Sequence, residues 1–187
     1  MGSEMCIRDR RNVVSELLEL SPAEFYNSDY RPTIRAVSLN YIDANGPVTF
    51  NHLAKKIARL HGFQRTGVKI RDQVRASILD QRLSTKSESS QVIYWPENAT
   101  PKPVIAFRGL GGGDEQRGWG DIPLPERVGL AREALTKSAD PMSYIKDALG
   151  VSRAGSMFQE EIRRAIDLAQ EMGDGDSTAD VVPIFGR

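Results

Sequence analysis

Apolar residues recur at helical spacing in three successive segments of the first half of the chain. The recurring positions are Ile34, Val37, Tyr41 and Ile42, then Leu53, Ile57 and Leu60, then Ile70, Val74 and Ile78. This spacing places the apolar side chains of each segment on one face of an α-helix. Pro32 and Thr49 suit the starts of the first two helices, and Gly46 and Gly62 suit their ends. The pattern therefore predicts helices over 32–45, 50–61 and 68–81.

A helical lead-in is expected over 11–30, before these three helices. Apolar residues cluster on one side of 11–20. The segment SPAE at 21–24 then offers Ser21 as an N-cap, Pro22 at the first helical position and Glu24 as the end of a capping box. These signals predict a second short helix that starts at Pro22.

Short extended segments are predicted at 47–49 and on either side of a polar turn. RLSTK (82–86) and QVIYW (91–95) flank SESS, which is typical of a hairpin. The order over 31–96 is therefore helix, short strand, helix, tight turn, helix and hairpin. This order is typical of a winged helix-turn-helix, in which the third helix reads DNA and the hairpin forms the wing.

The second half of the chain begins with a Pro/Gly-rich linker over 97–120. This linker brackets a possible strand at VIAF (104–107) and is expected to pack in part. Helical patterns resume over 121–172, and 173–187 reads as an acidic tail with a possible strand near its end. The predicted fold is mainly α with a small β wing.

An internal repeat links the two halves. GFQRTGVKIRDQVRASI at 62–78 aligns without gaps to GVSRAGSMFQEEIRRAI at 150–166. Five positions are identical, and each copy follows a short amphipathic helix that ends in Leu and Gly. The repeat predicts that a second, degenerate helix-turn-helix follows the first. Its QEE segment at 159–161 favours packing or protein contact over DNA contact.

Composition narrows the class of protein. The longest apolar runs are too short to span a bilayer, and a single cysteine excludes a disulfide within the chain. A cytoplasmic protein is expected, with no membrane partner. Neither a zinc-type Cys/His cluster nor a catalytic constellation is evident, and the glycine-rich 109–118 lacks the GK[ST] ending of a P-loop. The chain is therefore expected to need no cofactor or metal and not to be an enzyme by itself.

Charge is unevenly distributed in this neutral chain. Residues 51–86 contain nine Lys/Arg against two Asp/Glu, a net charge of +7, whereas 114–187 has a net charge of −5. Such a basic block is a candidate footprint for nucleic-acid phosphates. The candidate nucleic-acid-binding residues are Arg65, Thr66, Lys69, Arg71, Arg75, Arg82 and Lys86.

Arg65 is the most informative of these cations. A cation before a helix N-terminus opposes the helix macrodipole, so an anionic partner such as phosphate is one explanation. A salt bridge to a neighbouring carboxylate, or a hydrogen bond to a turn carbonyl, is the other. For the whole basic block, the alternatives are a solvated face or a face that docks on an acidic surface.

Several segments resemble an uncharacterised domain-of-unknown-function family. They are NGPVTFNHLAKKIARLHGFQRTGVKIRDQVRASI, IYWPE, DIPLPERVGLAREAL and LGVSRAGSMFQEEIRRAI, which together cover roughly residues 30–170. That family lies at the C-terminal end of large bacterial, defence-type proteins with a superfamily-one-type helicase and an endonuclease-like domain. The resemblance implies a winged-helix accessory segment whose partners are DNA and the helicase and nuclease domains of its parent protein. Arg65, Thr66 and Gly67 match the family's turn, which implies a structural or DNA-contacting role for them.

Residues 1–10 differ in character from the rest of the chain. MCIRDR at 5–10 resembles the translation of a transposon-end adapter used in sequencing libraries. On that interpretation 1–10 is not native, Cys6 has no redox or metal role, and the chain is the end of a larger protein. A genuine N-terminus and an expression remnant are the alternatives.

Two functional hypotheses follow from the sequence. The first is a non-catalytic module of a DNA helicase/nuclease that binds duplex DNA through the first winged helix. The second is a protein-interaction module that docks on its parent enzyme or dimerises without contacting DNA. A stand-alone transcriptional regulator is less favoured, because neither a ligand pocket nor a dimerisation helix is indicated.

Overall fold

The structure is a computed structural model that describes residues 20–78, 84–86, 91–112 and 116–173. These residues form two units. The first contains 20–78, 84–86 and 92–100, and the second contains Gln91, 101–112 and 116–173. In the described part of the chain, no helix is both long enough and apolar enough to cross a membrane.

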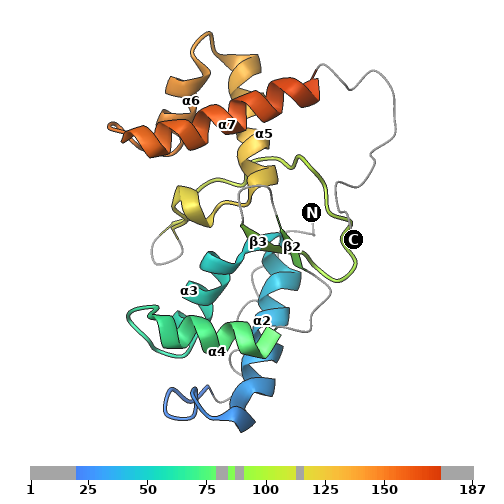
Figure 1. Cartoon of the computed structure of the whole chain (residues 1–187), viewed down its shortest axis with the longest axis vertical. Helices are drawn as coiled ribbons and strands as arrows, with labels where there is room; N and C mark the ends of the chain where they lie inside the picture. The colour runs from blue at the N-terminus through green and yellow to red at the C-terminus, as the bar shows by residue number, and fades with distance from the viewer. Residues whose placement is uncertain (1–19, 79–83, 87–90, 113–115, 174–187) are drawn as a thin grey trace, which may run out of the picture. The chain divides into compact units, whose positions relative to one another are not determined.

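The first unit combines three α-helices with a small sheet (blue to green in Figure 1). Its elements are η1 (Ser28–Tyr30), α2 (Arg31–Asn45), β1 (Val48–Thr49), α3 (Phe50–Leu60), α4 (Val68–Ile78), β2 (Ser84–Lys86) and β3 (Val92–Tyr94). The strand order is β1-β3-β2, and both pairings are antiparallel. In the register, Val48 lies opposite Tyr94, and Thr85 lies opposite Ile93. The prediction of a mainly helical chain with a small β component is confirmed.

The helix boundaries of this unit follow local signals in the sequence. Thr49 caps α3, because its Oγ1 accepts a hydrogen bond from the His52 backbone N–H at 3.2 Å. Gly46 ends α2 at a place without room for a side chain. A Cβ there would lie 2.6 Å from both the Ile42 carbonyl oxygen and Pro96 Cδ. The packing faces of α3 and α4 are those that the apolar periodicity predicted.

The capping-box prediction at 21–24 is wrong. Residues 22–26 form turns, in which the Phe25 N–H donates to the Pro22 carbonyl and the Asn27 N–H to the Glu24 carbonyl. The Gln73 side chain explains the difference, because its Nε2 donates to the carbonyls of Phe25 (3.0 Å) and Asn27 (3.3 Å). A tertiary contact with α4 therefore replaces helical hydrogen bonding. The helix predicted over 11–20 lies almost wholly outside the described residues.

His61, at the C-terminal end of α3, lies in the aromatic part of this core. It is only 1% exposed, and the rings of Phe25 and Tyr30 meet it edge-on at 4.9 and 5.7 Å. Its Nδ1 lies 2.8 Å from the Ile57 carbonyl oxygen, to which it can donate. Burial lowers the pKa of His61 below its ordinary value of 6.5, and the bond to Ile57 offsets only part of this effect.

We expect the first unit to lose stability on mild acidification. The unfolded chain takes up a proton near pH 6.5, whereas folded His61 resists protonation to lower pH. The contribution of neutral His61 to the free energy of unfolding is therefore complete above pH 6.5. It declines as the pH falls from there toward the pKa of His61 in the folded state. Urea unfolding at about pH 7.5 and about pH 5.5 measures this loss. His61→Leu, which copies Leu149 of the second repeat, should flatten the difference, and an equal pH dependence in both proteins would contradict the assignment.

The described residues of the second unit form three α-helices, one short 3-10 helix (η3) and an irregular segment (yellow to red in Figure 1). Its elements are η3 (Trp119–Asp121), α5 (Leu124–Lys137), α6 (Pro141–Ala148) and α7 (Ser156–Gly173). The possible strand at 104–107 is not a strand. This stretch packs along α5 as irregular backbone, and the Ile105 N–H donates to the Pro125 carbonyl at 3.0 Å.

The two copies of the repeat share their backbone geometry. Gly62 and Gly150 both have positive φ, at 79° and 64°, a conformation that glycine adopts without strain. In each copy the backbone N–H of the next residue donates to a carbonyl of the preceding helix at 2.9 Å. The donor is Phe63 and the acceptor Ala58 in the first copy, and the donor is Val151 and the acceptor Lys146 in the second. The following helices, α4 and α7, begin at equivalent positions. In both units the first helix packs on the other two, so the correspondence extends beyond the aligned segment.

Candidate nucleic-acid interface

Arg65 and Lys69 lie at the N-terminal end of α4 with exposed side chains. Within the described ranges neither side chain makes a hydrogen bond or an ion pair. The turn carbonyls that Arg65 was a candidate to bind are occupied instead by Arg59, whose Nη1 donates to Phe63 and Gln64. Both structural explanations for Arg65 are therefore absent from the described part of the chain. Thr66, between these two cations, is half-buried.

Arg71 and Arg75 lie one turn apart and flank the ring of Phe50. Their guanidinium carbons are 5.2 and 4.7 Å from the ring centroid, within the range of cation–π contacts. Arg71 Nη2 also donates to Asn51 Oδ1 at 2.6 Å. These contacts hold both guanidinium groups against the start of α3, so Arg71 and Arg75 have a packing role whatever else they bind.

The predicted wing contacts stay predictions. Arg82 lies outside the described residues, and for Lys86 the structure gives the backbone of β2 but not the side chain. Over the described stretch 51–78, seven cations face a single acid, Asp72, which is exposed on α4. The basic character of this stretch therefore does not depend on the hairpin.

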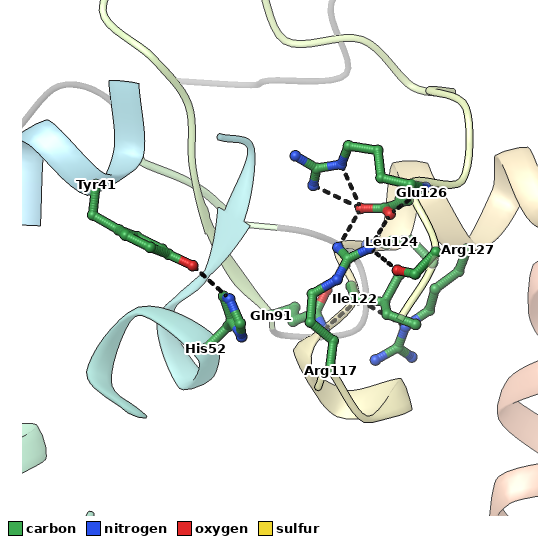
Figure 2. A network of polar contacts seen from close by, with 10 residues as sticks. Tyr41, His52, Gln91, Arg117, Ile122, Leu124, Glu126 and Arg127 are labelled. Carbon is green, nitrogen blue, oxygen red and sulfur yellow. Dashed lines mark hydrogen bonds and ion pairs between the residues drawn. The ribbon is translucent and has the colours of Figure 1, made fainter. Parts of the chain in front are cut away.

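A buried charge cluster in the second unit was not anticipated from the sequence. Figure 2 shows Arg117 directed at the carboxylate of Glu126, which is 0% exposed. Arg117 donates to Glu126 Oε2 at 2.9 Å and to Oε1 at 2.7 Å. Arg108 adds its backbone N–H at 2.9 Å and its Nη2 at 2.7 Å. Two guanidinium groups and one amide thus surround a single carboxylate, and both arginines come from the segment that was interpreted as a linker.

Electrostatics keep this carboxylate ionised. Burial alone would raise the pKa of Glu126, but the hydrogen bonds from Arg117 and Arg108 outweigh it and lower the pKa below its ordinary value. Its neighbour Arg127 is also buried, and its guanidinium lies 4.5 Å from the centroid of the Trp119 ring. Arg127 Nη2 donates to the Trp119 carbonyl at 2.7 Å, and Nη1 pairs with Glu161 at 3.0 Å. Because these charged groups bind one another and the backbone, the cluster is structural.

The sequence does contain a signal for this cluster. Glu126 and Arg127 occupy positions on the face of α5 that also carries Leu130, Ala131 and Ala134, all of them buried. A charge on an apolar helix face requires a partner in the core. That signal marks the two residues but does not identify their partners.

The histidines show no catalytic arrangement. Tyr41 Oη lies 2.8 Å from His52 Nε2, as Figure 2 shows, so His52 is half-buried and bonded rather than solvated. His61 lies at the C-terminal end of α3 and is buried. Among the described residues, no group of three or more His, Cys, Asp or Glu side chains gathers as a metal site.

Part of the chain matches the model of a protein family. No curated protein and no solved structure matches the chain. Residues 23–72 match the model of a domain family described as "Protein of unknown function (DUF3320)". The matched segment runs from the turns before α2, through α2 and α3, into α4, and it includes Arg65, Lys69 and Arg71. The first unit thus contains a segment similar to a domain family of unknown function.

Proposed function

We propose that the first unit is a winged helix-turn-helix that binds duplex DNA and acts as a non-catalytic accessory module of a larger helicase/nuclease. The order α2, β1, α3, α4, β2, β3 supports this, as does the pairing of β1 with β3 beside the hairpin. In such folds the third helix contacts DNA, and here that helix is α4. The association with a helicase/nuclease, and a cytoplasmic location, rest on the sequence resemblance and the composition.

The observation that carries the proposal is that the side chains of Arg65 and Lys69 are exposed and have no partner among the described residues. Both lie where the partial positive charge of the α4 N-terminus repels them, so they contribute nothing evident to folding. Phosphate oxygens would supply the missing partners, and phosphate contacts fix the register of a protein on a duplex. Asp72 follows on α4, and its charge would repel phosphate. We therefore propose that Arg65 and Lys69, at the beginning of α4, contact the phosphates of the DNA backbone.

The test is the double variant Arg65→Glu/Lys69→Glu. We expect duplex affinity to fall at least about tenfold and the slope of log K against log salt to decrease by about 2, since each lost phosphate contact contributes about 0.9. Fluorescence anisotropy of a labelled duplex, titrated from about 50 to about 200 mM salt, measures both quantities. Arg71 and Arg75 are less suitable targets, because their packing on Phe50 would confound the result.

The repeat supplies a matched control. Arg153, at the position equivalent to Arg65, is exposed, and so is Lys102. Arg153→Glu/Lys102→Glu changes the net charge equally and should leave affinity nearly unchanged. If both double variants lost the same amount of duplex affinity, the loss would be explained by the change in net charge and not by the positions of Arg65 and Lys69. Absence of duplex binding at low salt would favour the docking alternative, which Val68 supports because it is 74% exposed at the start of α4.

A further inference from the structure

A pocket of about 320 Å³ lies in the second unit beside the turn between α6 and α7. Most of its lining is apolar, and Arg117 and Gln116 contribute polar groups. The lining residues are Leu110, Gln116, Arg117, Gly118, Trp119, Leu149, Val151 and Phe158. Arg117 is already bound to Glu126, so the available surface is chiefly aromatic and aliphatic.

The first copy of the repeat shows what fills the equivalent place. Phe63, equivalent to Val151, meets the Phe25 ring at a centroid distance of 5.0 Å. His61, equivalent to Leu149, meets the same ring at 4.9 Å. In the first unit, therefore, aromatic rings in edge-to-face contact fill this turn. In the second unit aliphatic side chains stand at both positions, of which Val151 is smaller than its counterpart Phe63, and a pocket lies beside them.

Trp119 contributes one ring that corresponds to Phe25. Both residues lie in the segment before the first helix of their unit, and Trp119 packs edge-on against Phe158 at 5.7 Å. Two rings of the first copy, His61 and Phe63, have aliphatic residues at the equivalent positions of the second, whereas Phe158 of the second copy stands where the first has Ile70. The pocket thus has an aromatic wall, and at the position of Phe63 it has only the smaller side chain of Val151.

The exposed side of α7 also differs from that of α4. Lys69 of α4 is replaced by Met157, which is 82% exposed, and Arg71 is replaced by Gln159. The second copy therefore lacks, at both positions, the cations that could contact phosphate in the first. The pocket and Met157 both lie at the N-terminal part of α7.

We propose that this pocket binds an aromatic side chain of a protein partner, which takes the place that Phe63 fills in the first unit. Aromatic rings bury large areas, pair edge-to-face and act as anchors at protein interfaces. Trp119 and Phe158 provide the aromatic wall, and Val151 and Leu149 provide the aliphatic wall. This site does not depend on DNA binding by the first unit.

The probe for this site is N-acetyl-L-phenylalaninamide, with N-acetyl-L-alaninamide as the control ligand. Nuclear magnetic resonance of the ¹⁵N-labelled full chain resolves the indole N–H signals of its two tryptophans, Trp95 and Trp119. We expect saturable shifts at Trp119 with the phenylalanine probe, none with the alanine probe, and none at Trp95, which belongs to the first unit.

Two variants at one position give opposite expected results. Val151→Phe copies Phe63, should fill the pocket and should weaken probe binding at least tenfold. Val151→Ala enlarges the pocket and should retain binding. If Val151→Phe does not fold, Leu149→Phe offers a second way to fill the same space. The proposal is wrong if Trp119 does not shift up to the solubility limit of the probe, or if a folded, filled variant binds as well as the original protein.

Discussion

Glu126→Ala is expected to destabilise the second unit by about 3–5 kcal/mol, the usual cost of removing one partner from a buried ion pair. The substitution leaves the guanidinium of Arg117, which is only 12% exposed, without its carboxylate partner. It also removes the Glu126 oxygen that accepts a hydrogen bond from the Arg108 backbone N–H. Arg108 and Arg117 would then both lose their contacts with Glu126 of α5.

Hydrogen exchange measures this effect unit by unit. Amides of α5 and α7 should exchange faster in Glu126→Ala, while those of α2 to α4 serve as an internal reference. The control is Glu160→Ala, which removes an exposed pair with Arg163 between side chains that are 75% and 56% exposed. A pair of this kind contributes about 0–1 kcal/mol. Similar exchange rates in the two variants would argue against the buried cluster.

Gly129→Ala is expected to destabilise the same unit, against the usual preference of helices for alanine. In an exposed helix interior the change would gain about 1 kcal/mol. Here a Cβ would overlap the Ile105 carbonyl oxygen and lie 2.8 Å from its carbonyl carbon. Because backbone must move, we expect a net loss of about 1–3 kcal/mol.

Urea unfolding compares this variant with Gly155→Ala. A Cβ added at Gly155 would have no atom within 4 Å, and the residue lacks the positive φ that disfavours other side chains. Gly155 stands at the N-cap position of α7, where alanine is less favourable than glycine, so its replacement should cost no more than about 1 kcal/mol. An increase in stability for Gly129→Ala would show that 104–107 does not pack on α5 as described.

Local signals predicted most of the helical structure. Thr49 and Gly62 determined the two ends of α3, because caps and left-handed glycines act within a few residues. The repeat was visible because its glycines and inward-facing apolar positions fill the same roles twice. The helix predicted from Pro22 failed because Gln73, more than forty residues away, binds the carbonyls of Phe25 and Asn27, and no local pattern encodes that contact.

The candidate interface was predictable only in part. Clustering of cations in the sequence marked the basic stretch, but Arg71 and Arg75 proved to be held by Phe50, whereas Arg65 and Lys69 are unpaired within the described residues. Helical spacing assigns residues to a side of a helix and does not show what lies opposite. The Glu126 cluster also escaped prediction. Its partners Arg108 and Arg117 lie in the Pro/Gly-rich segment 97–120, which has no periodicity from which a facing residue could be inferred.

Gln91 limits how the protein can be divided into fragments, because it belongs to the second unit. Gln91 immediately precedes β3 of the first unit, yet it belongs to the second, where its Nε2 donates to the Ile122 carbonyl at 3.2 Å and its Oε1 accepts from the Leu124 N–H. A fragment that ends near residue 100 carries Gln91 without these partners, and a fragment that starts near 101 begins α5 without it. Each unit is therefore discontinuous in sequence, and no single cleavage point separates two intact halves.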